Sequence, residues 1–77
     1  MNKQTRSHLS SIYNKMDSLT DELDDLMLDQ QAVYDNIPEN LQQSKRGIAQ
    51  EEIVDSLDTA VECFRQGLDS LQEAIDK

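Results

Sequence analysis

The segment DNIPENLQQSKRG, residues 35–47, decides the fold, because it interrupts a chain that elsewhere has the pattern of long helices. It holds Pro38, the only proline, and Gly47, one of two glycines. A proline ring removes a backbone donor and clashes with the preceding helical turn, so the first helix must end before Pro38. Ser44 is a favourable N-cap for a helix that begins after it. The segment therefore predicts a turn between two helices.

Before the turn, apolar residues recur at alternating spacings of three and four residues, with Gln30 as one polar interruption. This heptad pattern predicts a helix over about residues 5–35. A polar residue such as Gln30 in a heptad seam can fix the register or the choice of partner. The apolar series comprises Leu9, Ile12, Met16, Leu19, Leu23, Leu26, Val33 and Ile37.

After the turn, apolar and small residues occupy three neighbouring columns of a helix expected over about residues 45–76. Small residues one heptad apart would let another helix approach closely, and an acidic column must face water. The apolar columns are Leu57, Phe64 and Leu71; Ile53, Ala60, Gly67 and Ala74; and Val54, Val61, Leu68 and Ile75. The acidic column is Asp55, Glu62, Asp69 and Asp76.

Together these patterns predict an all-α fold, a single domain over residues 1–77 that forms an antiparallel, coiled-coil-like helical hairpin with its turn at about residues 36–44. Residues whose numbers sum to about 80 should then lie level, as Leu19 with Val61 and Leu26 with Val54.

Each helix has a wider apolar stripe than one neighbour covers. We therefore expect a homodimer that forms a four-helix bundle, with a groove on another protein as the alternative. The expected assembly interface comprises Met27, Leu28, Leu57, Ala60, Val61, Phe64, Gly67, Leu68 and Leu71.

Charge limits the choice of partner. The chain has 16 acidic and 7 basic residues, a net charge of −9. This argues against direct binding to nucleic acid or to an anionic membrane, and it allows a basic host protein. The acid is otherwise a solvated surface, and the Lys45–Arg46 pair is either solvated or a contact for an acidic partner. The acidic residues considered as contacts are Asp17, Asp21, Asp24, Asp25, Asp29, Asp55, Glu62 and Asp69.

The sequence predicts no catalytic, cofactor-binding or metal-binding residues. His8 and Cys63 are each the only residue of their type, too few for a zinc site. His8 lies near the N-terminus and Cys63 at the edge of the seam, so we expect no nucleophile beside a base. Glu22 with Asp25, and Glu52 with Asp55, have a spacing that helical nucleotide pyrophosphatases use for magnesium, but both pairs occupy outward columns. The single thiol, the lack of an apolar leader and the lack of a spanning segment favour a cytoplasmic protein.

The turn IPENLQQS (residues 37–44) and the helix EEIVDSLDTAVECFRQGLDSLQEAI (residues 51–75) resemble small uncharacterised acidic proteins of Gram-positive bacteria and their phages. The resemblance implies a helical hairpin of phage or mobile-element type and supplies no activity. The leading hypothesis is a non-enzymatic, homodimeric interaction module. The alternatives are a phage-type inhibitor whose acidic surface mimics nucleic acid and, third, a magnesium-dependent nucleotide hydrolase.

Overall fold

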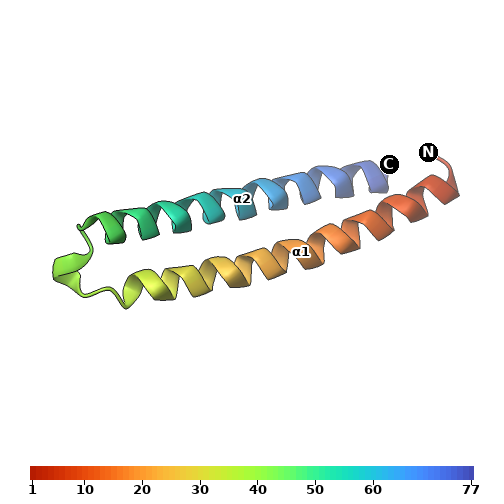
Figure 1. Cartoon of the computed structure of the whole chain (residues 1–77). Helices are drawn as coiled ribbons and strands as arrows, with labels where there is room; N and C mark the ends of the chain where they lie inside the picture. The colour runs from red at the N-terminus through yellow and green to blue at the C-terminus, as the bar shows by residue number, and fades with distance from the viewer.

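The computed structural model describes all 77 residues and consists of two helices packed side by side in opposite directions (Figure 1). Helix α1 spans Lys3–Asp35, a short 3-10 helix η1 spans Glu39–Leu41, and helix α2 spans Lys45–Asp76. The molecule measures 58 × 15 × 13 Å, and both termini lie at the end opposite the turn. The predicted all-α helical hairpin is confirmed.

The first turn of α1 is capped by Asn2, which lies outside the helix with an extended backbone. Its side-chain oxygen accepts a hydrogen bond from the backbone N–H of Thr5 at 2.7 Å. Because this bond satisfies one of the free N–H groups of the first turn, it stabilises the helix start. As a result α1 begins at Lys3, two residues before the expected start.

The turn has hydrogen bonds of its own. The backbone N–H of Leu41 donates to the carbonyl of Pro38 at 2.7 Å, which closes η1. The side-chain amide of Gln42 donates to the carbonyl of Ile37 at 3.3 Å, across the break that Pro38 makes. The segment that separates the helices is therefore a compact turn and not a loose linker.

Gly47 is required where α2 meets this turn. Its N–H donates to the Oγ of Ser44, the N-cap of α2, at 3.3 Å. A Cβ at Gly47 would lie 2.6 Å from the backbone carbonyl carbon of Gln42 and 2.8 Å from its Cα. Only a residue without a side chain fits this close backbone approach. The contact turns the Gly47 side of α2 toward the rest of the hairpin.

The core follows from that orientation. Val54, Val61 and Leu68 lie at seven-residue intervals from Gly47, on the same side of α2, and all three are buried. On α1 the buried position is Thr20, which is 3% exposed. Its hydroxyl donates to the backbone carbonyl of its own helix at Met16, 2.7 Å away, so burial leaves it satisfied.

One of the two columns of the predicted seam on α1 is wrong, whereas the other, with Leu9, Met16, Leu23 and Gln30, is half-buried as expected. Leu19 and Leu26 belong to the predicted seam, yet they are 63% and 55% exposed. The buried column of α1 is that of Thr20, one position further along the helix. The physical reason is the small side chain of Thr20, which permits close packing of the helices at its column, where Tyr13, Met27 and Tyr34 are half-buried.

The register between the helices is as expected. The side-chain amide of Gln50 donates to the backbone carbonyl of Gln30 at 2.9 Å and to its Oε1 at 3.0 Å. The residue numbers of this pair sum to 80, the predicted value for level positions. No other side-chain hydrogen bond joins the two helices. The glutamine pair therefore fixes the position of α2 along α1.

Candidate functional site

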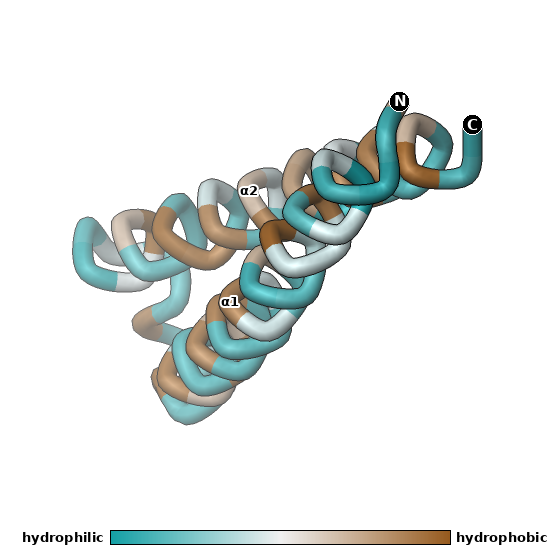
Figure 2. Tube along the Cα trace, turned by 90° about the vertical axis from the view of Figure 1, so that its right-hand side faces the viewer, coloured by the Kyte–Doolittle hydropathy of each residue, from teal (hydrophilic) through white to brown (hydrophobic).

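More large apolar residues are exposed than buried in this hairpin. Five of the 77 residues are buried, whereas ten large apolar residues are exposed. Apolar positions recur along the full length of both helices (Figure 2). On α1, four of the five exposed ones form a column with one residue in each heptad, namely Ile12, Leu19, Leu26 and Val33.

Most of the exposed apolar residues of the two helices lie on one side of the molecule, and Leu28 of α1 and Ile48 of α2 are the exceptions. Leu19 of α1 and Phe64 of α2, which is 47% exposed, line the same hollow of about 290 Å³ together with Met16, Thr20 and Leu23. Residues three, four or seven positions apart share a side of a helix. The spacing from Leu19 and from Phe64 therefore gives the other residues on this side of α1 and of α2. We call the resulting surface the apolar face: Ile12, Leu19, Leu26 and Val33 of α1 with Ile53, Ala60, Phe64, Gly67 and Ala74 of α2.

The α2 half of the apolar face is open to close approach. A Cβ built at Gly67 meets no atom within 4 Å, so α1 does not cover this position. The next column outward on α2 contains only small uncharged residues, although 30% of the chain is charged. A helix backbone can approach closely over such a surface without displacing hydrated charges. The outward column is Ala49, Ser56, Cys63 and Ser70.

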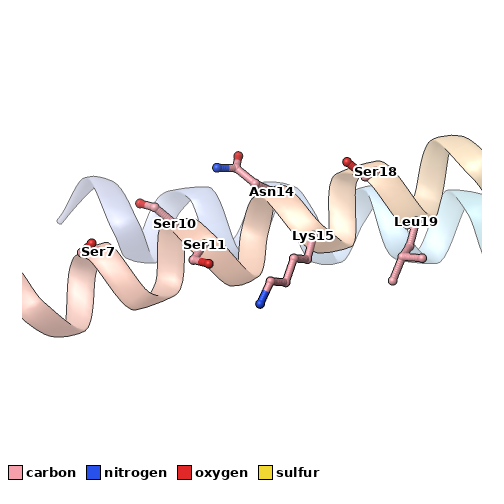
Figure 3. Close-up of a pocket in the computed structure, with 7 residues that line it drawn as sticks. All are labelled: Ser7, Ser10, Ser11, Asn14, Lys15, Ser18 and Leu19. Carbon is pink, nitrogen blue, oxygen red and sulfur yellow. The ribbon is translucent and has the colours of Figure 1, made fainter.

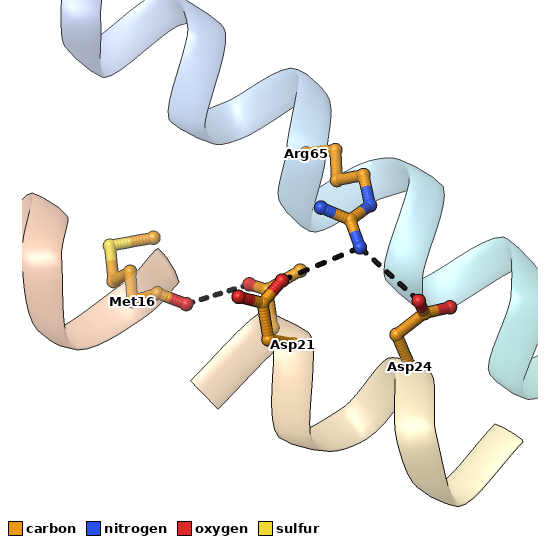
Figure 4. Close-up of polar contacts among 5 residues, drawn as sticks. Met16, Asp21, Asp24 and Arg65 are labelled. Carbon is orange, nitrogen blue, oxygen red and sulfur yellow. Dashed lines mark hydrogen bonds and ion pairs between the residues drawn. The ribbon is translucent and has the colours of Figure 1, made fainter. Parts of the chain in front are cut away.

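The opposite side of the hairpin is polar. Arg65 of α2 reaches between two carboxylates of α1, with its Nη2 3.5 Å from Asp24 and 3.7 Å from Asp21 (Figure 4). Such exposed pairs contribute at most about 1 kcal/mol. We call this side the acidic face: Asp17, Asp21 and Asp24 of α1, with Glu51 and Asp58 of α2, which share the side of Arg65 by their helical spacing. The hairpin thus has two unlike faces.

The structure divides the expected assembly residues among different surroundings. Val61 and Leu68 are buried between α1 and α2, so neither is free to contact a second copy. Met27, Leu57 and Leu71 are half-buried along the edges of the core. These five residues hold the hairpin itself together, because the shift in phase moved the core onto their side of each helix.

The remaining four expected assembly residues are more accessible. Ala60, Phe64 and Gly67 lie on the apolar face, although Ala60 is half-buried. Leu28 is 55% exposed but lies on the far side of α1, two residues beyond Leu26. Because two residues turn a helix by about 200°, Leu26 and Leu28 point in nearly opposite directions. The expected set therefore does not form one patch.

The acidic residues considered as partner contacts do not converge on one surface either. Asp17, Asp21 and Asp24 lie on the acidic face, and the last two are engaged by Arg65. The others are exposed on outward positions of both helices, at Asp25, Asp29, Asp55, Glu62 and Asp69.

The Lys45–Arg46 pair lies at the first turn of α2, and both residues are exposed. Neither makes an ion pair within the hairpin. Arg46 borders a hollow of about 340 Å³ at the turn, together with Val33, Pro38 and Leu41. Leu41 is 48% exposed, so the turn end of the molecule is only partly covered.

The histidine, the cysteine and the carboxylates do not gather into a metal-binding cluster. No group of three or more His, Cys, Asp or Glu residues lies close enough to hold a metal ion. His8 and Cys63 are exposed on different helices. The largest surface hollow is an open, serine-rich strip along α1 alone (Figure 3), without an acid, a histidine or a cysteine.

Sequence reasoning missed the column Ile12, Leu19, Leu26 and Val33 as the exposed part of α1, because its heptad spacing is that of a core column. The signal that could have found it is Thr20. Thr20 lies in the same heptad column as Tyr13, Met27 and Tyr34, and its small side chain permits close packing at the centre of a hairpin.

Neither α1 nor α2 contains a stretch long and apolar enough to cross a membrane. Comparisons with models of protein families, with curated proteins and with solved structures find no match to this chain.

Proposed function

We propose that the protein is a non-enzymatic helical interaction module that acts as a homodimer, in which the apolar faces of two copies form the core of a four-helix bundle. The observation that carries this proposal is the unpartnered apolar face, with Leu19 at 63% exposure and Phe64 at 47% exposure. Contiguous exposed apolar surface of this kind marks a site of protein association.

The size of the face supports a second copy as its occupant. The side of the hairpin that carries the apolar face measures 58 × 15 Å, about 900 Å² in projection, so it has room for the roughly 800 Å² per partner that a stable interface buries. The second copy brings an equally long apolar surface, and two hairpins stacked on each other give the four-helix arrangement in which every apolar column has a neighbour.

Charge supports the same occupant. A net charge of −9 opposes self-association, but the acid lies mainly on the acidic face and on outward positions. These charges stay in water in the dimer, where salt screens them over a Debye length of about 8 Å. The apolar face itself holds no carboxylate, so dimerisation buries no unpaired acid.

Two leucines on α1 provide a matched test. Leu26 lies on the apolar face and Leu28 does not, yet both are 55% exposed. Leu26→Glu should convert the dimer to a monomer in light scattering after gel filtration, because it would bury a carboxylate. Leu28→Glu, which changes the net charge equally, should remain a dimer. Equal behaviour of the two variants would contradict the apolar face as the interface.

A further inference from the structure

We propose that the two hairpins of the dimer lie antiparallel, with α1 stacked on the second copy's α1, α2 on its α2, and the two turns at opposite ends. This inference rests on the proposed homodimer and specifies how the second copy is oriented. It follows from a charged column that borders the apolar face on α1.

Two symmetric arrangements stack the apolar faces and keep all neighbouring helices antiparallel. In one, the turns lie at the same end and α1 covers the second copy's α2. In the other, the turns lie at opposite ends and each helix covers its own counterpart. Apolar burial alone does not select between them, because both arrangements cover the whole 58 Å length of the face.

The column next to Leu19 and Leu26, on the side of α1 away from α2, distinguishes the two arrangements. It runs from basic to acidic along the helix, and in the hairpin none of its charged members makes an ion pair. Charged residues that flank an apolar seam between helices set the orientation of the partner. The column consists of His8, Lys15, Glu22 and Asp29, all exposed.

Opposite orientation pairs this column with itself. Because α1 spans Lys3–Asp35, full overlap of two oppositely directed copies places residues whose numbers sum to about 38 level with each other. Lys15 then lies level with the second copy's Glu22, to within about one residue, and the symmetry axis generates the pair twice. His8 lies level with the second copy's Asp29 in the same way.

The arrangement with both turns at one end offers no such match. There the charged column of α1 would border the outward column of the second copy's α2, which is Ala49, Ser56, Cys63 and Ser70 and carries no charge. In the opposite orientation these small residues instead border the same column of the second copy's α2. They lie on the side of α2 where Gly67 leaves the backbone open to a close neighbour. Both columns are thus matched only when the hairpins run in opposite directions.

A distance between the two turns tests this orientation directly. Asn40 is exposed in the turn, so Asn40→Cys in a Cys63→Ser background accepts one spin label per copy. Pulsed electron paramagnetic resonance should give a label separation close to the 58 Å length of the hairpin. A separation below about 25 Å, roughly two helix diameters, would overturn the orientation and leave the dimer intact. A monomer at all concentrations would overturn the proposed function together with this inference.

Charge exchange provides the second test. Lys15→Glu and Glu22→Lys should each weaken the dimer by about tenfold at low salt, since each variant replaces two attractive pairs with two like-charged pairs. The double variant should return to within about threefold of the original dissociation constant, because it exchanges the charges and keeps the match. Single variants without an effect, or a double variant as weak as the singles, would overturn the pairing.

Discussion

At the scale of the residue, the two glycines have opposite surroundings. A Cβ at Gly47 collides with the backbone of Gln42, whereas a Cβ at Gly67 meets nothing within 4 Å. Gly47→Ala should therefore lower the free energy of unfolding by about 1–3 kcal/mol, as overpacking does. Gly67→Ala should raise it by about 0.5–1 kcal/mol, because alanine favours a helix interior over glycine. Urea denaturation followed by circular dichroism measures both, and a shift of the same sign for the two variants would refute this account.

A substitution at Gly67 can distinguish the packing of the hairpin from the assembly of the proposed dimer. In the hairpin alone, a leucine at position 67 would extend into open space, so Gly67→Leu should leave α1 and α2 packed as before. In the dimer the same side chain would force apart the closely spaced helices of the two copies. We expect Gly67→Leu to remain helical by circular dichroism and to lose the dimer in sedimentation. Loss of helix content at all concentrations would mean that the residue acts on the fold itself.

At the scale of the element, the glutamine pair fixes how far α2 lies along α1. Gln50 makes both of the side-chain hydrogen bonds that join the helices. Gln50→Ala should cost about 1 kcal/mol of stability, the usual net value of such a bond, since Gln30 is only half-buried and water can replace the lost donor. Replacing both residues by leucine should raise the melting temperature. A loss of more than about 3 kcal/mol in Gln50→Ala would indicate a role beyond register.

The elements were predictable from local chemistry, but their rotation about their own axes was not. Pro38 and Ser44 mark the turn in any helical context, and a turn centred near Asn40 sets which residues lie level, so the helix limits at the turn and the register follow from the sequence. The side of α2 that faces α1 depends on the backbone contact between Gly47 and Gln42, which involves no side-chain pattern. Three apolar columns on α2 allow more than one rotation, and contacts such as this one, which the heptad pattern does not show, select one of them.

The candidate site shows the same division. A surplus of apolar width is visible in the sequence and predicts a partner surface. The members of that surface depend on which columns the hairpin uses for itself, so Val61 and Leu68 became core while Ile12, Leu19, Leu26 and Val33 became surface. Charged columns are less sensitive to this choice, because Asp55, Glu62 and Asp69 stay exposed under any rotation that buries an apolar column.

At the scale of the whole molecule, the hairpin is a rod with an apolar face, an acidic face and very little interior. Val54, Val61 and Leu68 are the only buried apolar side chains, a core too small to make a chain of this length very stable by itself. Burial of the apolar face in the proposed dimer would supply the missing interior. The dimer should then unfold and dissociate together, with a melting temperature that rises with protein concentration.

Sedimentation equilibrium of the unmodified protein at low micromolar concentration, in low salt and in high salt, tests the central claim most directly. We predict the mass of a dimer in both conditions, with tighter association in high salt, because screening reduces repulsion between two chains of net charge −9 while apolar burial is retained. A stable, fully helical species with the mass of one 8.8 kDa chain in both conditions would contradict the account, because the apolar face would then lack the second copy that it requires.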